Sequence, residues 1–438
     1  MKATKFLSLA ALALTFAACS SDDNELTQQP AEQPGEITIT ATIDASDGAA
    51  TRALGIDGDN IASNYVVGEK IAVLFEYNSE QVQRDAEVKS LDGTTAKVEF
   101  TIPADLTGSQ TATLVYPATA VNTTKNGADV ATALATQDGT IANCPEVRTG
   151  TGTLDASAKT LTVGSALAAQ NAIFKLTLKD IDGTGNVSAT SVIISDQNGV
   201  VTTVTTSATN EMYVALPTTA TTLKFLVTGS DSKKYFNMAS GLSLGANYYQ
   251  SIVKLATVGD VILSTGKCAK AGTSGAVAKI CYLGDETGES AYNYTNGLAL
   301  ALSDANGGSA CIWKTSQTDA GHTKQPSSTF TEESGLQYND ATHNSDTYPA
   351  FKAAIAYNST TAAPTGCSKW FLASGYQWQK MAGAEGVGGY NNLGLQEYSA
   401  YWSSSESDAE CAWFFDDGYW MSNGKDGGPF RVRACLAF

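Results

Sequence analysis

The chain has 438 residues, of which 43% are hydrophobic and 16% are charged, and its formal net charge is −17. This composition is typical of folded domains with buried cores, not of a disordered chain, and the length allows two or three domains. The negative charge disfavours nucleic acid and anionic membrane surfaces, so no nucleic-acid partner is expected. With only two histidines, His322 and His343, histidine catalysis and zinc binding are also disfavoured.

Residues 1–18 have the pattern of a secretory signal peptide, because Lys2 and Lys5 precede a short apolar run that ends in small residues. The run is too short for a permanent transmembrane helix. Cys19 follows it directly, and this arrangement resembles the lipobox of bacterial lipoproteins. The resemblance implies cleavage before Cys19, lipid on its sulfur and a surface-exposed lipoprotein of the outer membrane. The alternative is an ordinary secreted protein with an incidental cysteine.

Residues 19–36 are rich in Ser, Asp, Gln, Glu and Pro, which predicts a flexible tether. From residue 37 to residue 256 the pattern is β throughout. Residues 37–43 alternate apolar side chains with threonine, as a strand with one buried face does. Asp-Gly, Asn-Gly and Pro signals separate the later strands, which are predicted at 71–75, 98–102, 111–116, 173–178, 192–194, 212–216, 223–227 and 248–255. We interpret this region as two β-sandwich domains, 37–165 and 166–256.

Residues 258–438 differ in composition, with more aromatic residues and cysteines, and are predicted to form an α+β domain with long loops. Helices are expected near 296–304, from Pro349 to about 357, and from an N-cap at Ser374 to about 384. Short strands are expected at 412–415 and 432–436. Six of the eight cysteines lie here, and an oxidising exterior would favour disulfides among them. Fifteen pairings are open, and some of the six could instead be free thiols: Cys268, Cys281, Cys311, Cys367, Cys411 and Cys435.

Residues 19–256 combine the lipoprotein start and the threonine-rich strand at 37–43 with the segments 51–54 (TRAL), 67–73 (VGEKIAV) and 114–117 (LVYP). In this combination they resemble the fimbrillins, the pilus subunits of Bacteroidetes. The resemblance implies cleavage of the Arg52–Ala53 bond, removal of the first strand, and acceptance of a strand from a stalk pilus subunit. The alternative is that Arg52 is a solvated loop residue.

Residues 258–438 contain the segments 297–302 (GLALAL), 370–374 (WFLAS), 401–406 (YWSSSE), 413–415 (WFF) and 432–438 (VRACLAF). Through these segments the region resembles C-type-lectin-like modules. The resemblance implies that long loops bind an extracellular glycan or protein ligand. The calcium-dependent sugar triplets of such lectins are absent, so calcium-mediated sugar binding is not expected.

The sequence ends at Phe438 inside this predicted domain, directly after a predicted core strand, so no free tail is expected to be donated to another subunit. A subunit that accepts a strand without giving one belongs at the distal end of a fibre. We therefore predict a fimbrial tip subunit and adhesin of the cell outer membrane. The alternative is a monomeric surface lipoprotein that binds its ligand without pilus assembly.

The aromatic segment near residue 416 contains the predicted ligand-binding residues Asp416, Asp417, Tyr419 and Trp420. The alternative is that they pack in a core around a hairpin turn, which is expected for Trp402 and Trp413. His322 and His343 have polar neighbours and are expected to be exposed. No metal site, cofactor or catalytic residue is predicted, and a comparison with formylglycine-generating enzymes, which resemble this domain in fold only, does not support an enzyme. The predicted fold class is mainly β: two fimbrillin-like β-sandwich domains followed by an α+β C-type-lectin-like domain.

Overall fold

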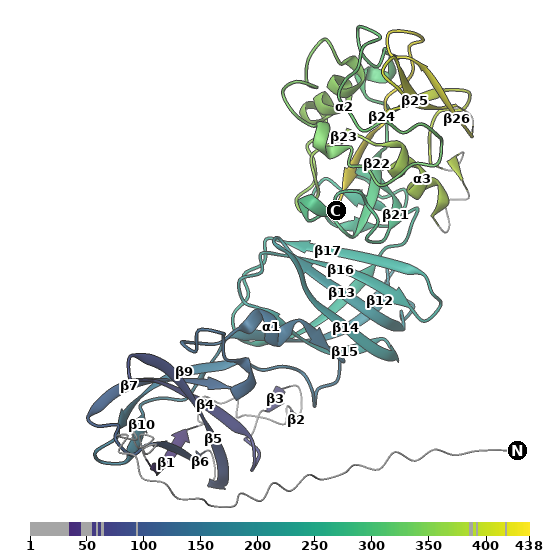
Figure 1. The fold of residues 1–438 in the computed structure, drawn as a ribbon. Helices are drawn as coiled ribbons and strands as arrows, with labels where there is room; N and C mark the ends of the chain where they lie inside the picture. The colour runs from purple at the N-terminus through teal and green to yellow at the C-terminus, as the bar shows by residue number, and fades with distance from the viewer. Residues whose placement is uncertain are drawn as a thin grey trace, which may run out of the picture.

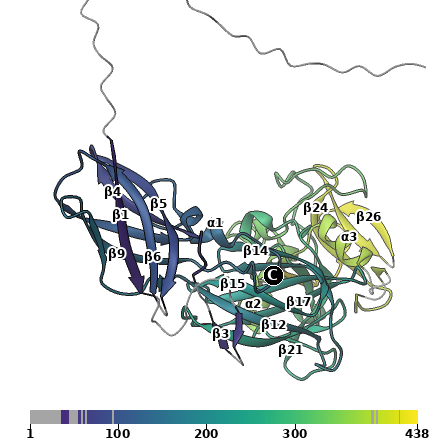
Figure 2. The same cartoon turned by 90° about the horizontal axis from the view of Figure 1, so that it is seen from below.

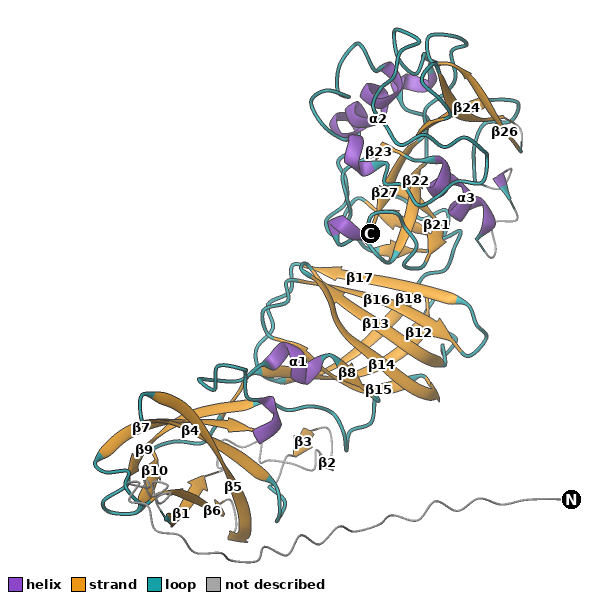
Figure 3. Cartoon of the chain, in the orientation of Figure 1, coloured by secondary structure: helices purple, strands orange, loops and turns teal. Residues whose placement is uncertain are grey.

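The computed structural model describes residues 35–44, 55–57, 60–62, 65–92, 95–384, 389–390, 393–416 and 418–438. They form three units in a row, with the N-terminal unit at one end and residues 258–438, here called the head, at the other (Figure 1). Strands dominate the first two units, whereas the two longest helices and the long loops lie in the head (Figure 3). The prediction of a mainly β chain is therefore confirmed.

The first unit is a single sheet that closes on itself. Its strands are β1 (Glu36–Asp44), β4 (Lys70–Tyr77), β5 (Glu80–Asp92), β6 (Thr95–Pro103), β7 (Ser109–Tyr116), β9 (Arg148–Asp155), β10 (Thr160–Val163) and β11 (Ala168–Ala169). They follow the order β10-β1-β6-β5-β4-β7-β9-β11, and β10 also pairs with β9. Where we predicted a sandwich, this second pairing of β10 completes a barrel, which leaves fewer exposed strand edges. Figure 2 shows β1 beside β6 in this barrel.

The alternation expected of a half-buried strand is regular in β1, where the threonines face outward and Ile39, Ala41 and Ile43 are buried. They belong to one apolar cluster with Val98 of the neighbouring strand β6 and Phe75 of β4. Two short strands, β2 (Gly55–Asp57) and β3 (Asn60–Ala62), pair only with each other.

The second unit consists of two packed sheets. One has the order β15-β12-β18 and the other the order β17-β16-β13-β14-β8. The strands are β8 (Thr136–Gln137), β12 (Asn171–Asp180), β13 (Ala189–Asp196), β14 (Gly199–Thr209), β15 (Glu211–Pro217), β16 (Thr222–Gly229), β17 (Lys234–Ser240) and β18 (Tyr248–Leu255). Their inward side chains form a common core that includes Leu176, Val192 and Phe225.

The chain crosses between the first two units more than once. Helix α1 (Val130–Leu134) and β8 join the second unit, where β8 pairs with β14 in parallel. The chain then returns to the first unit through β9, β10 and β11 before β12 begins. The division near residue 165 remains a prediction; β11, just beyond it, still pairs with β9.

The head contains a six-stranded sheet of order β20-β19-β21-β22-β27-β23 and a three-stranded sheet of order β24-β25-β26. The strands are β19 (Val261–Leu263), β20 (Cys268–Ala269), β21 (Ala276–Leu283), β22 (Gly297–Ala301), β23 (Phe371–Leu372), β24 (Ala400–Glu406), β25 (Cys411–Asp416), β26 (Tyr419–Gly424) and β27 (Ala434–Ala437). Short 3-10 turns of the head are η2 (Ser290–Tyr292), η3 (Asn306–Gly308) and η4 (Leu336–Tyr338). A further 3-10 turn, η1 (Ala118–Ala120), follows β7 outside the head.

The helix predicted at 296–304 is wrong, because residues 297–301 form β22. All five are buried, and β22 lies between β21 and β27. A short run of glycine, alanine and leucine is ambiguous in sequence, and here burial on both faces of a sheet decides its form.

The other two predicted helices are confirmed. Helix α2 spans Pro349–Thr360 with Pro349 in its first turn. Helix α3 spans Gly375–Gly383, and the Ser374–Gln377 capping box is present in both directions. None of the described helices is both long and apolar enough to cross a membrane.

Candidate functional site

Three groups of predicted site residues fall in different places. The lipidation site Cys19, the cleavage pair Arg52 and Ala53, and Asp417 lie outside the described residues. Arg52 and Ala53 stand between β1 and β2 in the sequence. The remaining predicted residues, Asp416, Tyr419 and Trp420, lie on the β25–β26 hairpin of the head.

Strand β1 closes the barrel of the first unit. It pairs with β6 along its whole length, from Glu36 opposite Pro103 to Asp44 opposite Thr95. On its other side, Thr42 lies opposite Thr162 of β10 in a parallel pairing. Loss of β1 would therefore leave one edge of β6 and one edge of β10 unpaired and open the apolar interior between them.

The segment from Ala434 to Phe438 is held inside the head. Strand β27 pairs with β22 on one side and with β23 on the other. The Phe438 ring is fully buried and lies 4.5 Å, between ring centroids, from Phe236 of the second unit. The carbonyl of Phe438 also accepts the backbone N–H of Asn296 at 2.9 Å. Withdrawing this segment would separate β23 from the main sheet of the head and leave one edge of β22 unpaired.

The β25–β26 hairpin places the predicted binding residues together. Asp416 and Tyr419 lie opposite each other at its end. Tyr419 is 74% exposed, whereas Trp420 is half-buried and donates its indole N–H to the Tyr390 hydroxyl at 2.6 Å. Phe330 lies under Trp420, with 4.6 Å between the ring centroids. Trp402 and Trp413 are core residues, as predicted.

A recess of about 250 Å³ adjoins this hairpin. Phe415 stacks on Tyr390 in its wall, with 4.0 Å between ring centroids, and Tyr398 at its rim is 86% exposed. The other lining residues are Leu395, Gln396, Glu397 and Ser399. The sequence analysis missed Tyr390 and Tyr398, because isolated tyrosines in a glycine- and asparagine-containing loop carry no periodic signal.

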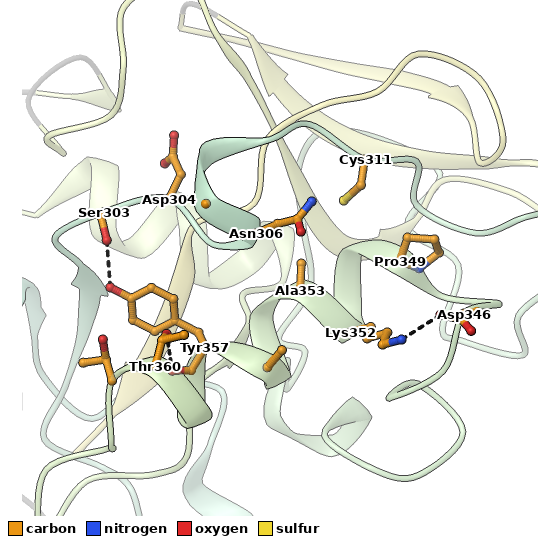
Figure 4. A pocket seen from close by; sticks show the side chains of 13 residues that line it. Ser303, Asp304, Asn306, Cys311, Asp346, Pro349, Lys352, Ala353, Tyr357 and Thr360 are labelled. Atoms are coloured by element: carbon orange, nitrogen blue, oxygen red, sulfur yellow. Dashed lines mark hydrogen bonds and ion pairs between the residues drawn. The ribbon is translucent and has the colours of Figure 1, made fainter.

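A larger cavity of about 550 Å³ lies between α2 and the loop around η3 (Figure 4). Helix α2 presents small side chains such as Ala353 to it, and the Tyr357 hydroxyl hydrogen-bonds with the Ser303 hydroxyl at 3.0 Å. Asp304 anchors the opposite wall by accepting from Arg433 Nε at 2.7 Å and from Arg431 Nη1 at 3.1 Å. This hydroxyl-lined cavity was not predicted from the sequence.

Buried charges support the hairpin from below. Glu406 and Lys425 are both fully buried and form an ion pair, and Lys324 pairs with the second carboxylate oxygen of Glu406. Lys425 also donates to the backbone carbonyls of Thr318 and Ala409. Because every charge in this cluster has a partner, the cluster can persist without water.

The expectation that His322 and His343 are exposed is wrong, because each is only 7% exposed. Their Nε2 atoms lie 2.9 Å apart. Tyr338 stacks on His322 with 3.6 Å between ring centroids. Burial lowers the pKa of His322 to about 4 and raises the pKa of the nearby Glu333 to about 7.

The disulfides expected among the six cysteines of the head are absent, and these six side chains are thiols. Cys281 and Cys435 are fully buried, and burial raises the pKa of both thiols. Within the described ranges, no three His, Cys, Asp or Glu side chains are grouped so as to hold a metal ion.

No protein-family model matches the chain, and no curated protein matches it. Solved structures with some similarity include a candidate cell adhesion protein of Bacteroides fragilis, at 13% identity and TM-score 0.30 over 50% of this chain and 90% of that one. A fimbrial assembly protein of Parabacteroides distasonis has 12% identity and TM-score 0.31 over the same shares. A candidate cell adhesion protein of Bacteroides uniformis has 13% identity and TM-score 0.28 over 50% and 93%. Similarity this low does not establish a common fold or function.

Proposed function

We propose that the chain is a surface-anchored adhesin that serves as the tip subunit of a fimbrium. The observation that carries the proposal is the position of β1. It closes the barrel, its buried side chains Ile39, Ala41 and Ile43 fill part of the interior, and the Arg52–Ala53 bond follows it in the sequence.

Removal of β1 after cleavage would expose the free edge of β6 and an apolar trough. A strand from a stalk pilus subunit would restore the hydrogen bonds, and its alternating apolar side chains would fill the trough in one register. The lipid on Cys19 would anchor the precursor to the outer membrane until this exchange releases it.

The pairing and burial of β27 support the tip position. Because residues 434–438 are paired and buried in the head, this segment is not available for donation while the head is folded. The subunit would accept a strand at one end and present the head at the other. The head would then bind an extracellular glycan or protein ligand through Tyr419, Trp420 and the adjoining recess, without enzymatic activity. A monomeric surface lipoprotein with the same head is the alternative.

Cleavage by an arginine-specific protease tests the assembly step. The chain has only five arginines at which such a protease could cut. The four that lie in the described ranges are in strands or next to them. Arg148 is buried against Glu146, and Arg431 and Arg433 hold Asp304. We expect one cut and a product that begins at Ala53, as read by N-terminal sequencing, and no cut in Arg52→Gln.

A peptide of residues 36–44 then probes the vacated groove. It should bind the cut protein and raise its melting temperature, whereas the same peptide with Ile39→Asp and Ile43→Asp should not. Strand exchange would be refuted if the protease cuts at other arginines. It would also be refuted if the cut protein, after removal of β1, does not bind the peptide.

Ligand binding is tested separately on the intact chain with glycan and host-protein arrays. Tyr419→Ala should abolish binding to the array ligand that the wild-type chain binds. Tyr292 is an exposed tyrosine elsewhere on the head, and Tyr292→Ala should retain this binding. Equal signals from both variants would exclude the hairpin as the binding surface without affecting the strand-exchange result.

A further inference from the structure

The only two histidines of the chain face each other in the head. His322 Nε2 and His343 Nε2 are 2.9 Å apart. His322 Nδ1 lies 3.2 Å from the Ser404 carbonyl oxygen, and His343 Nδ1 lies 2.9 Å from Asp340 Oδ1. The pair therefore forms a continuous chain of polar contacts from β24 to residue 340.

The partners at the two ends determine the protons within this chain. A backbone carbonyl can only accept, so His322 Nδ1 must carry hydrogen and donate to Ser404. The Asp340 carboxylate also accepts, so His343 Nδ1 must carry hydrogen as well. Two bare Nε2 atoms would repel each other at 2.9 Å, and one proton between them removes the repulsion. The two rings thus hold three protons and one positive charge, which Asp340 offsets.

A fourth proton cannot be accommodated in this geometry. It would place two N–H groups against each other across the 2.9 Å contact, without an acceptor between them. Tyr338, Trp313 and Phe351 surround His322 and exclude water that could separate the rings. Binding of a fourth proton by the two rings must therefore break the contact between the two Nε2 atoms.

The charged groups around the pair do not remove this constraint. Glu406 lies on the β24 side and favours protonation of His322, while Lys324 opposes it and is itself paired with Glu406. Asp340 adjoins only His343. Glu333 hydrogen-bonds with Tyr338 and Ser405, and Tyr348 and Lys314 border the opposite side.

The contact between the two rings joins the two arms of residues 314–348, here called the long loop, and the His322 bond to Ser404 ties that loop to β24. The same loop carries Phe330, which lies under Trp420 and against Trp413. Gln325 on the loop accepts the indole N–H of Trp413 through its carbonyl at 2.6 Å. The long loop therefore supports the aromatic side of the proposed ligand surface.

We propose that His322 and His343 form an acid-released latch that holds the long loop under the ligand surface and lowers ligand affinity when both rings are protonated. The proposal rests on the proposed function of the hairpin, because it concerns regulation of that surface. Acidification would separate the rings, free the long loop, withdraw Phe330 and leave Trp420 without support.

The stability of the closed latch should change with pH in one direction over the acidic range. Burial lowers the pKa of His322 from 6.5 to about 4, so the closed state takes up fewer protons than the open state in this interval. The latch therefore weakens as the pH falls from 6.5 toward 4. Opening should become about tenfold more favourable per pH unit where the open state binds one additional proton.

The experiment follows the two imidazoles by NMR and the long loop by hydrogen exchange in the full chain, with no ligand needed. At pH 7 the two rings should show three N–H hydrogens. Between pH 6.5 and 4, exchange of amides in residues 314–348, corrected for intrinsic rates, should rise about tenfold per pH unit. His343→Gln, whose side-chain oxygen can accept a hydrogen bond from a protonated His322 Nε2, should weaken this dependence, and Asp346→Asn on the same loop should leave it unchanged.

Opposite results would overturn the latch. Rings that titrate near 6.5 without a change in loop exchange would show that the pair does not hold the loop. Stabilisation by added zinc that is lost in His343→Gln would show that the two Nε2 atoms hold a metal ion in place of a shared proton. If loop opening occurs but hairpin ligand binding is unaffected, the coupling to Trp420 is refuted while the proposed adhesin function stands.

Discussion

Thr42 of β1 lies opposite Thr162 of β10, and this parallel pairing joins the two ends of the first sheet. The strands that it brings together are far apart in the sequence. The barrel therefore depends on one N-terminal strand that is paired on both sides, which is the condition under which exchange of that strand has a large structural effect.

Truncation of an inward side chain of β1 should destabilise the first unit. Ile43 is fully buried in the barrel, so Ile43→Ala should lower its stability by about 2–5 kcal/mol. Thr40→Ala, on the exposed face of the same strand, should have little effect. Denaturant unfolding followed by hydrogen exchange of β6 amides measures the difference, and equal effects would argue against a packed β1.

Removal of one member of the buried ion pair should destabilise the head. Lys425→Met leaves the fully buried Glu406 carboxylate with Lys324 as its remaining charged partner, and we expect a loss of about 3–5 kcal/mol. Lys352→Met, which breaks the exposed pair with Asp346, is the control and should be nearly neutral. Thermal unfolding of both variants provides the comparison; a stable Lys425→Met would mean that water or Lys324 compensates for the loss.

Glu333 should make the head less stable at alkaline pH. Burial raises its pKa from 4.5 to about 7, so the folded head binds a proton that the unfolded chain releases. This contribution, on the order of 3 kcal/mol, is complete below pH 4.5 and is lost as the pH rises through 7.

Melting temperatures between pH 5 and 8 measure the effect of Glu333. The wild-type value should fall over this range through Glu333, and Glu333→Gln should reduce the slope. Glu332→Gln, at the exposed neighbouring position, should reproduce the wild-type slope. A slope that survives Glu333→Gln would assign the pH dependence to another group.

Cys281 and Cys435 should remain thiols even in an oxidising exterior. They lie on β21 and β27, which are separated by β22, so their backbones are about 9.5 Å apart. A disulfide requires a Cα separation of about 4.4–6.8 Å. Alkylation of unreduced, denatured protein followed by peptide mass spectrometry should label both residues, and a peptide linked through them would refute the sheet order.

Several elements could be predicted because their signals are local. Strand β18 spans the predicted residues 248–255, since alternating apolar side chains identify a strand from its own sequence. Helix α3 begins where the Ser374–Gln377 capping box indicates, because both partners lie within one turn. By contrast, residues 297–301 carry no distinguishing period, and their neighbours β21 and β27 made them a strand.

The candidate site was predicted only in part for the same reason. The aromatic hairpin with Asp416, Tyr419 and Trp420 was identified from composition and a turn signal. Tyr390, which accepts from Trp420, is thirty positions away in the chain. His322 and His343 were assigned to the surface from their polar neighbours, whereas folding of the long loop brings them together in the interior.

Sequence alone was enough for the strand alternation, the starts of α2 and α3 and the division into β-rich and aromatic-rich regions, because each depends on residues a few positions apart. The tertiary structure decided that Thr42 meets Thr162, that His322 meets His343 and that residues 434–438 lie between two strands. These contacts join distant segments, and they form only because burial of apolar surface and pairing of buried polar groups select one arrangement of the whole chain.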